Sequence, residues 1–502
     1  MTAPASDTRL VEHLRGRAVR LVTAQGTLGD DAVRARIDRT VDWLQRTGTR
    51  RVASRLDNGP GWFALDLAIR QVGGVHVPLP TFFSPAQVAH ALASSGADCI
   101  VTAAADTMPA GAKAPVGLLD GGALAGWRVA ATDGVDTQLP AGTACITYTS
   151  GTTGQPKGVC LDADTLLTVA GSLVDASSAI RPRRHLCLMP LSTLLENVAG
   201  LYATVLADAE IALPSLAEIG YTGATGLDVP TLLRCLHRYR PESVILVPQL
   251  LLALVMAAEQ GAPLPDSLRY IAVGGGRIGP GLLARARALR LPVHEGYGLT
   301  ECGSVVCLNR PGAVRDGSVG QALPHARVSV VDGELCVDGA RALGFLGGAP
   351  MPDGPVRTGD LGHVDADGFV HVTGRRKNVF ITAFGRNVSP EWVESELLAH
   401  PAIGQAVVHG EGQADNVAVL VPRRPDLDDS RIARALAEVN AGLPDYARVA
   451  RFVRAAAPFT ATDGLLTANG RPRRAAILSR YQADIDACYR GDPTVPTPGV
   501  AA

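Results

Sequence analysis

The chain has 502 residues, with 47 Lys and Arg against 48 Asp and Glu, and a formal net charge of −1. This balance excludes the basic footprint typical of proteins that bind nucleic acids. Hydrophobic residues make up 47% of the chain, which is enough for a sizeable core. The most apolar stretch, residues 244–258, is interrupted by Pro248 and Gln249 and is shorter than the about 20 residues of a membrane span. We therefore expect neither a nucleic-acid partner nor a membrane span.

The nine Cys are scattered along the chain, without a CxxC pair or a Cys/His cluster. This pattern disfavours a disulfide framework and a zinc site, and it favours a reducing compartment. The N-terminus lacks the basic and then apolar pattern of a signal peptide. We therefore expect a cytoplasmic protein.

Short apolar runs alternate with helical patterns in the first part of the chain. Strands are expected at residues 52–56, 75–79 and 99–101, and helices at 62–72 and 85–94. The same rhythm returns with strands at 243–247 and 270–273 and helices at 249–258 and 280–288. Such alternation predicts a largely parallel sheet covered by helices.

The pattern changes after about residue 322. Short strands at 328–331, 334–337, 368–372 and 379–382 are separated by Asp-Gly turns at 332–333 and 367–368, which is typical of antiparallel hairpins. A compact unit then follows, with helices at 390–398 and 429–440 and strands at 406–408 and 417–420. The tail from Gly491 is rich in Pro and Thr, and we expect it to be disordered.

These patterns predict an α/β protein of two domains. Residues 1–373 would form a large N-terminal domain of layered sheets and helices with a small antiparallel, barrel-like subdomain. Residues 374–490 would form a small mobile α+β domain, and residues 491–502 a disordered tail.

Residues 148–159 read Tyr-Thr-Ser-Gly-Thr-Thr-Gly-Gln-Pro-Lys-Gly-Val and follow an apolar strand-like run. Glycine lets backbone N–H groups approach an anion, hydroxyls add donors, and lysine supplies charge. The pattern differs from the P-loop, because Pro156 precedes Lys157 and no Ser or Thr follows it. It predicts a phosphate-binding loop, formed by Thr149, Ser150, Gly151, Thr152, Thr153, Gly154 and Lys157.

In this loop the chain resembles the superfamily of acyl-adenylate-forming enzymes, which includes acyl-CoA synthetases, nonribosomal-peptide adenylation domains and luciferases. The resemblance spans about residues 57–474. It implies that the loop holds the β- and γ-phosphates of ATP, with Lys157 as a catalytic residue.

Residues 294–301 read His-Glu-Gly-Tyr-Gly-Leu-Thr-Glu. An aromatic ring between glycines can present its face to a flat base, and the neighbouring Thr and Glu offer oxygen ligands, which suit Mg²⁺. The resemblance implies that Tyr297 stacks on adenine and that Thr300 and Glu301 are catalytic, with Glu301 and Thr152 as metal ligands. The nucleotide site would also include Gly275, Gly276, Glu295, Gly296 and Gly298.

Two later motifs complete the resemblance. Residues 357–362 read Arg-Thr-Gly-Asp-Leu-Gly, and a carboxylate such as that of Asp360 can accept two hydrogen bonds from a vicinal diol. Residues 374–377 read Gly-Arg-Arg-Lys. By resemblance, Asp360 binds the ribose hydroxyls, Arg375 contacts ribose or phosphate, and Lys377 is the hinge between the domains.

The substrate region departs from the family pattern. Its Leu-Pro-Leu-x-His segment appears as Met-Pro-Leu-Ser-Thr, so Thr193 replaces the usual His. We take Thr193, Asn197 and Gly274 as pocket residues, together with Arg277, which could meet an anionic substrate or be a solvated loop residue. An Asp of the kind that binds the ammonium of an α-amino acid has no convincing equivalent, which disfavours that substrate class.

The C-terminal motif also departs. Residues 466–471 read Leu-Thr-Ala-Asn-Gly-Arg, and Arg471 stands where the family has a catalytic Lys that contacts the substrate carboxylate and the α-phosphate. Arginine keeps the charge but has a wide planar head. Arg471 either performs the same role or marks a modified first step or an unusual substrate.

The resemblance implies an adenylate-forming ligase that uses ATP and Mg²⁺. A fatty or aromatic carboxylic acid would form an acyl-AMP with release of pyrophosphate and then pass to a thiol of CoA or of a carrier-protein phosphopantetheine. An acyl carrier protein is thus a possible partner. Two alternatives remain open: activation of nitrite for diazotisation of an aryl amine on the same fold, and an inactive nucleotide-binding protein.

Overall fold

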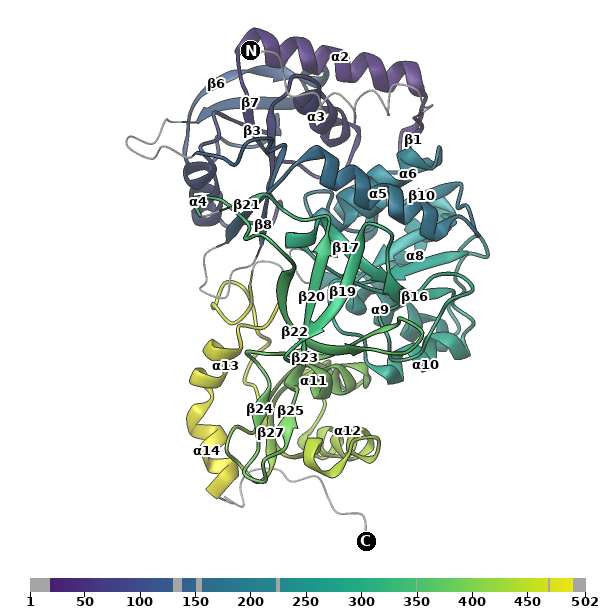
Figure 1. Ribbon diagram of the computed structural model, residues 1–502, viewed down its shortest axis with the longest axis vertical. Coiled ribbons are helices and arrows are strands. Elements are labelled where there is room, and N and C mark those ends of the chain that lie inside the picture. The colour runs from purple at the N-terminus through teal and green to yellow at the C-terminus, as the bar shows by residue number, and fades with distance from the viewer. Residues whose placement is uncertain are drawn as a thin grey trace.

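A computed structural model describes residues 19–129, 138–149, 156–222, 226–348, 350–467 and 470–490. Two large sheets with their helices form most of the molecule, a four-stranded sheet lies beside them, and a small domain forms the far end (Figure 1). The predicted α/β class is confirmed, with its antiparallel subdomain and small C-terminal α+β domain. The expected tail from residue 491 lies outside the described residues.

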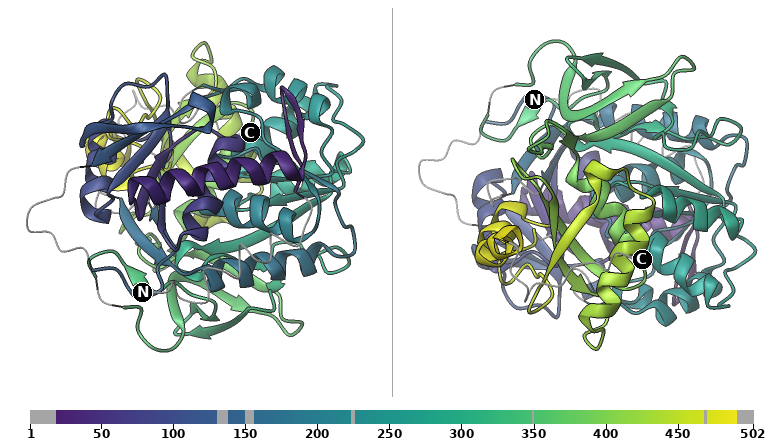
Figure 2. Two further views of the ribbon diagram at one scale, coloured as in Figure 1. Left: turned by 90° about the horizontal axis from the view of Figure 1, so that it is seen from above. Right: turned by 90° about the horizontal axis from the view of Figure 1, so that it is seen from below.

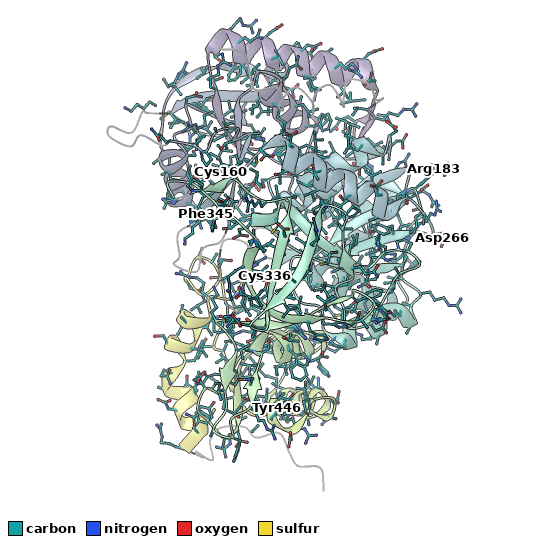
Figure 3. The ribbon with its side chains drawn as sticks, viewed as in Figure 1. Cys160, Arg183, Asp266, Cys336, Phe345 and Tyr446 are labelled. Carbon is teal, nitrogen blue, oxygen red and sulfur yellow. The ribbon has the colours of Figure 1, made fainter. Side chains whose placement is uncertain are left out.

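The first sheet has eight strands and contains the predicted strand–helix alternation. Helix α4 (Pro85–Ser95) begins at a capping box, in which the Ser84 hydroxyl accepts from the backbone of Gln87 and the Gln87 side chain accepts from the backbone of Ser84. The strands, in sheet order, are β21 (Gly344–Phe345), β9 (Lys157–Leu161), β8 (Cys145–Thr149), β4 (Val75–Pro78), β3 (Arg51–Arg55), β5 (Cys99–Ala103), β7 (Leu124–Val129) and β6 (Ala112–Leu119). The helices of this part are α2 (Asp30–Thr47), α3 (Pro60–Gln71), α4 (Pro85–Ser95), α5 (Ala163–Ser177) and the short η1 (Asp120–Gly122). Figure 3 labels Cys160 and Phe345 where β9 and β21 meet.

The second sheet has nine strands, of which β1, β11, β10, β14, β15 and β16 run parallel. Its strands, in order, are β18 (Gln321–Ala322), β17 (Ser304–Leu308), β16 (Val293–Leu299), β15 (Tyr270–Val273), β14 (Ser243–Leu246), β10 (Arg184–Leu186), β11 (Glu210–Ala212), β1 (Leu21–Thr23) and β2 (Gly26–Leu28). The hairpin β12 (Tyr221–Thr222) and β13 (Gly226–Leu227) stands apart. The helices are the π-helix η2 (Glu196–Tyr202), α6 (Ala203–Leu206), α7 (Leu216–Ile219), α8 (Val229–Tyr239), α9 (Pro248–Glu259), α10 (Pro280–Ala288) and η3 (Thr300–Cys302).

A buried polar network ties the π-helix η2 to the first sheet. The Tyr202 hydroxyl donates to Asp66 Oδ2 at 2.5 Å, and Asp66 Oδ1 lies 2.6 Å from His76 Nδ1 and 3.3 Å from Arg70 Nη2. Although burial alone would raise it, the pKa of Asp66 is held well below its usual range by Arg70, His76 and Tyr202. Because a buried charge is costly without partners, this network fixes η2 relative to α3.

The four-stranded antiparallel sheet follows, with β19 (Ala326–Val331), β20 (Glu334–Gly339), β22 (Val356–Val364) and β23 (Val370–Arg375) in that order. Asp332 and Gly333, at the turn between β19 and β20, both have positive φ, at 52° and 73°. That is the backbone of a two-residue hairpin turn, as the Asp-Gly pattern predicts.

The C-terminal domain lies in front of the larger domain when the molecule is seen from below (Figure 2, right). Its strands are β24 (Phe380–Ile381), β25 (Asn387–Val388), β26 (Ile403–His409), β27 (Asn416–Pro422) and β28 (Val449–Arg454). Its helices are α11 (Pro390–Ala399), α12 (Asp429–Ala441), η4 (Asp445–Ala447), α13 (Arg474–Arg480) and α14 (Gln482–Arg490). Glu394 of α11 receives two hydrogen bonds from Arg474 and one from the backbone of Val408, which joins α11 to β26 and α13.

All nine Cys are buried and unpaired. Within the described ranges, no helix has both the length and the apolar character that crossing a membrane requires.

Candidate active site

A large cavity of about 1860 Å³ lies between the N-terminal domain and the C-terminal domain. All described residues of the predicted site line it except Asn197. They come from the β8–β9 hairpin, the loop after β15, strand β16, helix η3, strands β22 and β23, and the segment before α13. Residues distant in the sequence are therefore brought to one cavity.

The centre of the site is a cluster of Tyr297, Asp360 and Arg375. The Tyr297 hydroxyl donates to Asp360 Oδ2 at 2.7 Å, and Arg375 Nε lies 3.2 Å from Asp360 Oδ1. Asp360 and Arg375 are register partners on β22 and β23, so the sheet places them side by side. Burial raises the pKa of Asp360, against the opposing effects of Arg375 and Tyr297. With a side chain 14% exposed, Asp360 still has access to the cavity.

The glycine at position 298 is required by a close backbone approach. A Cβ at Gly298 would lie 1.8 Å from the Ser304 carbonyl oxygen, where β16 and β17 pair with an irregular register after Tyr297. Only glycine fits here, so the Gly-Tyr-Gly pattern reflects the local packing that aims Tyr297 at Asp360.

The glycine segment at residues 274–276 forms the part of the cavity wall that contacts the C-terminal domain. Gly275 has φ +77°, a conformation that favours glycine. Its carbonyl oxygen accepts a hydrogen bond from Arg471 Nη2 at 3.1 Å. This contact brings Arg471 across the domain boundary into the cavity, where burial and Arg375 lower the pKa of its guanidinium.

Arg277 lines the cavity, but one end of its guanidinium is occupied. Its Nη1 donates to the carbonyl oxygens of Val372 and Thr373, each at 3.1 Å. Burial lowers the pKa of Arg277, while Glu295 acts in the opposite direction. Arg277 therefore joins the loop between β15 and α10 to β23, and its role towards an anionic substrate stays a prediction.

Glu295 lies on the same wall and is half-buried. Burial raises its pKa to about 8, although Arg277 and Arg287 oppose the shift. The side chain is therefore mostly protonated at neutral pH and can donate a hydrogen bond.

The central residues of the phosphate loop, from Ser150 to Gly154, lie outside the described residues. The two flanking residues are described: Thr149 ends β8, Lys157 begins β9, and they are register partners that both line the cavity. The loop is thus the connection of a β-hairpin, and Lys157 is exposed towards the cavity.

Thr300 and Glu301 lie on helix η3 and line the cavity beside Tyr297. The Glu301 carbonyl accepts from Ala342, which anchors η3 to the segment before β21. Thr152, the second metal ligand implied by the resemblance, lies outside the described residues.

The predicted hinge residue Lys377 lies in the turn that follows β23. Lys377 is exposed, but partial burial of its ammonium group and the positive charge of Arg375 together lower its pKa. The turn is held by hydrogen bonds from Asn378 and Val379 to the Arg375 carbonyl. The boundary placed between residues 373 and 374 falls inside β23, two residues before this turn.

The predicted pocket residues Thr193 and Asn197 are placed differently from one another. Thr193 closes a turn on the Pro190 carbonyl and lines the cavity. Asn197 is 4% exposed within η2, and its Nδ2 has no partner among the described residues. It faces protein rather than the cavity.

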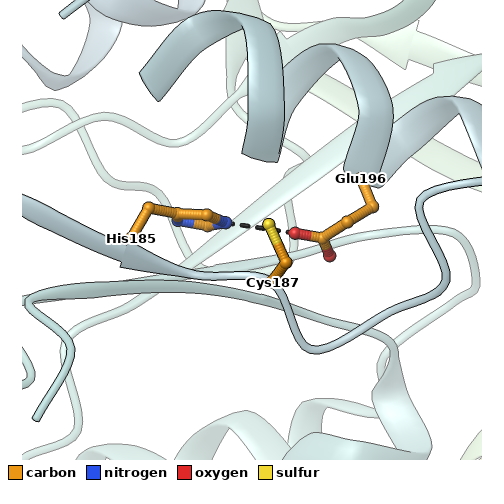
Figure 4. A group of neighbouring side chains, drawn as sticks. All are labelled: His185, Cys187 and Glu196. Carbon is orange, nitrogen blue, oxygen red and sulfur yellow. Dashed lines mark hydrogen bonds and ion pairs between the residues drawn. The ribbon is translucent and has the colours of Figure 1, made fainter. Parts of the chain in front are cut away.

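Glu196, the residue before Asn197, forms a buried contact with His185 that the sequence analysis did not predict. Glu196 is fully buried, and its Oε1 lies 3.1 Å from His185 Nε2 (Figure 4). Its Oε2 accepts a hydrogen bond from the Met189 backbone. Cys187 lies beside them, and burial raises the pKa of its thiol well above the usual range. These donor types could suit a metal, but His185 uses both ring nitrogens in hydrogen bonds and the thiol stays protonated. We regard the cluster as a hydrogen-bonded part of the core.

Residues 17–344 match the AMP-binding enzyme family, and residues 377–492 match the AMP-binding enzyme C-terminal domain. The chain is 28% identical to the long-chain-fatty-acid–CoA ligase FadD15 of Mycobacterium bovis, over 85% of this chain and 86% of the relative. It is also 28% identical to feruloyl-CoA synthase of Amycolatopsis sp, over 75% and 79% of the two chains.

Two solved structures share the fold. The o-succinylbenzoate CoA synthetase of Bacillus subtilis in complex with the acyl-adenylate OSB-AMP has a TM-score of 0.74 at 23% identity, covering 95% of this chain and 98% of that chain. The anthranilate CoA ligase AuaEII in complex with anthranoyl-AMP has a TM-score of 0.76 at 18% identity, covering 96% and 98%. The predicted resemblance is confirmed, and the chain belongs to the family of AMP-binding enzymes, as an adenylate-forming ligase.

Proposed function

We propose that the protein uses ATP to convert a fatty or aromatic carboxylic acid into an acyl-AMP and then transfers the acyl group to a thiol, with CoA as the first candidate. The observation that supports this most strongly is the cluster of Tyr297, Asp360 and Arg375, which faces the same cavity as Lys157 and Arg471. A carboxylate beside an aromatic ring and a guanidinium suits a ribose, a base and a phosphate.

In the first step, a carboxylate oxygen of the acid attacks the α-phosphorus of ATP, and pyrophosphate leaves. Asp360 would accept hydrogen bonds from the ribose hydroxyls, for which its hydrogen bond from Tyr297 must shift or be shared. Lys157 and Arg471, which line the same cavity, would stabilise the charge that develops on the phosphates.

The oxygen donors at one wall fit Mg²⁺. Glu301 and Thr300 line the cavity beside Tyr297, and carboxylate and hydroxyl oxygens are ligands that Mg²⁺ accepts. When bound, the ion would offset the negative charge of the phosphates. We assign Glu301 and Thr152 as the protein ligands.

In the second step, the C-terminal domain would rotate about Lys377 so that the thiol can reach the anhydride. The Arg471 contact to Gly275 would have to break in this rotation, since it crosses the domain boundary. The relatives named as CoA ligases favour CoA as the acceptor, and a carrier-protein phosphopantetheine is the second candidate.

The proposal is tested by ATP–pyrophosphate exchange over a panel of fatty and aromatic acids. We expect exchange that depends on both acid and Mg²⁺ and that falls by at least about 100-fold in Asp360→Ala. Exchange with nitrite alone, together with diazotisation of an added aryl amine, would instead establish the diazotase alternative. Nucleotide binding without exchange for any acid or for nitrite would establish the inactive alternative.

A further inference from the structure

The cavity continues from the nucleotide wall along one face of the second sheet. His185, Ser243 and Tyr270 are register partners on the adjacent parallel strands β10, β14 and β15, and all three line the cavity. Ile245 and Ala272, two residues further along, line it as well. Alternate residues of a strand lie on the same face of the sheet, so Tyr270, Ala272 and Gly274 lie on one face. The distance along the strand from Tyr270 to Gly274 is about 13 Å for four residues.

The far end of the cavity, defined by His185, Ser243, Tyr270 and the nearby Tyr221, is unusually polar. The Ser243 hydroxyl lies 3.0 Å from His185 Nδ1, and His185 Nε2 lies 3.1 Å from Glu196 (Figure 4). Because a carboxylate only accepts hydrogen bonds, Nε2 carries the proton towards Glu196. In the neutral ring Nδ1 then accepts from Ser243, so the Ser243 oxygen keeps free lone pairs towards the cavity.

Two tyrosine hydroxyls at this end are unused. Tyr221 and Tyr270 line the cavity, and neither hydroxyl has a hydrogen-bond partner among the residues that the structure describes. Tyr270 is 8% exposed and stacks on His294, with ring centroids 4.7 Å apart, so its ring is fixed. A hydroxyl that lines a cavity without a protein partner can form a hydrogen bond with a polar group of a ligand.

The charges around this end favour a neutral ligand group. The Lys and Arg residues among the described lining residues come from the phosphate-loop hairpin, the glycine segment, the hinge and the C-terminal domain, and none comes from β10, β14 or β15. A second carboxylate would lie near the buried charge of Glu196, behind His185, and the lining residues of these strands offer no compensating cation. An ammonium would lack an ion-pair partner, because Glu196 does not line the cavity and is hydrogen-bonded to His185 and Met189.

We propose that the acid substrate carries a neutral hydrogen-bonding group, such as a hydroxyl or carbonyl, at the end remote from its carboxyl group. This group binds between Ser243, Tyr221 and Tyr270, at the far end of the cavity. The inference rests on the proposed function, because it assumes that an acid occupies this cavity, and it makes a hydrocarbon-ended fatty acid the poorer substrate.

The test compares acids of matched length: a medium-chain fatty acid with its ω-hydroxy and ω-carboxy counterparts, and cinnamic acid with para-hydroxycinnamic acid. We expect kcat/KM for pyrophosphate exchange to be about tenfold higher for the hydroxylated member of at least one pair, since one hydrogen bond to a neutral partner is worth about 1–1.5 kcal/mol. In Tyr270→Phe or Tyr221→Phe the ratio of kcat/KM between the hydroxylated and the unsubstituted acid should shrink towards one.

The matched control is Tyr239→Phe. Tyr239 is buried in the same core, donates to Glu218 and is not a lining residue, so its loss should leave the preference unchanged. Equal rates within every pair, or a preference for the ω-carboxy acid, would overturn the inference and leave the proposed function standing. If no acid supported exchange, the proposed function would fail first.

Discussion

At the scale of single residues, Arg471 departs most from the family pattern and makes the most informative contact. Its Nη2 donates to the Gly275 carbonyl, and no other side-chain hydrogen bond of Arg471 is found among the residues that the structure describes. The rest of the guanidinium could therefore contact the substrate carboxylate and the α-phosphate in the proposed reaction. The ammonium group of lysine is compact, so it could not contact the same set of acceptors that the planar guanidinium of arginine reaches. We therefore regard Arg471 as adapted to this site.

We predict that Arg471→Ala slows adenylation by about 10²–10³-fold, since one charged group that stabilises the transition state is lost. Arg471→Lys should recover only part of this loss. The control is Arg473→Ala, because Arg473 also lines the cavity but donates within its own domain to Gly464. Single-turnover formation of acyl-AMP measures the step, and an unchanged rate in Arg471→Ala would show that Arg471 has no part in it.

The raised pKa of Glu295 predicts that the stability of the protein depends on pH. Its pKa is about 8 in the folded protein, against an ordinary value of 4.5, so the folded state binds more protons between these values. Stability is therefore lost as the pH rises from about 4.5 to 8. We expect Glu295→Gln to be more stable than the wild type above pH 8, by up to a few kcal/mol, and equal to it below pH 4.5.

Chemical unfolding at several pH values measures this difference. Glu259→Gln is the control of opposite sign, since the hydrogen bond from Arg285 lowers the pKa of Glu259. Its stabilising contribution is present above pH 4.5 and is lost as the pH falls. A constant difference between Glu295→Gln and the wild type across the range would mean that Glu295 titrates normally.

At the scale of elements, the π-helix η2 depends on Glu196. We predict that Glu196→Ala lowers the free energy of unfolding by about 2–5 kcal/mol, because His185 Nε2 and the Met189 N–H lose their acceptor inside the core. The control is Glu438→Ala, in which the exposed His400–Glu438 pair is lost at a cost of about 0–1 kcal/mol. Equal effects in urea unfolding would show that the buried pair is no more important than a surface one.

The hinge proposed at the turn after β23 can be tested separately from the charge of Lys377. The described backbone hydrogen bonds of this turn are donated by Arg376, Asn378 and Val379 and none by Lys377. Lys377→Pro would therefore fix φ near −65° without removing a described bond. We predict that it slows thiol transfer much more than adenylation, whereas Lys377→Ala, which keeps the dihedral freedom, affects both steps similarly. Equal losses in both steps of Lys377→Pro would exclude Lys377 as the pivot.

At the scale of the whole molecule, the site joins the two large sheets, the four-stranded sheet and the C-terminal domain. A ligand whose free concentration is 100 times its Kd stabilises the folded state by about 2.7 kcal/mol. We predict that MgATP raises the unfolding midpoint of the full chain and that Asp360→Ala removes most of this shift. Asp367→Ala, in an exposed turn of the same sheet, should keep it. An equal shift in Asp360→Ala and the wild type would place the nucleotide elsewhere.

The sequence by itself determined the fold class and the family, and it supplied most residues of the proposed nucleotide site. Strand–helix alternation is local, and the glycine-rich motifs surrounding Lys157, Tyr297 and Asp360 keep their chemistry within a few residues, so both can be read without contacts. Pairings between distant segments could be decided only by the tertiary structure. The carbonyl partners of Arg277 lie about 95 residues away, and the far end of the substrate cavity is made by the strand register of His185, Ser243 and Tyr270. No local pattern marks such residues, because their nearness results from the packing of parallel strands whose neighbours are set by the whole fold.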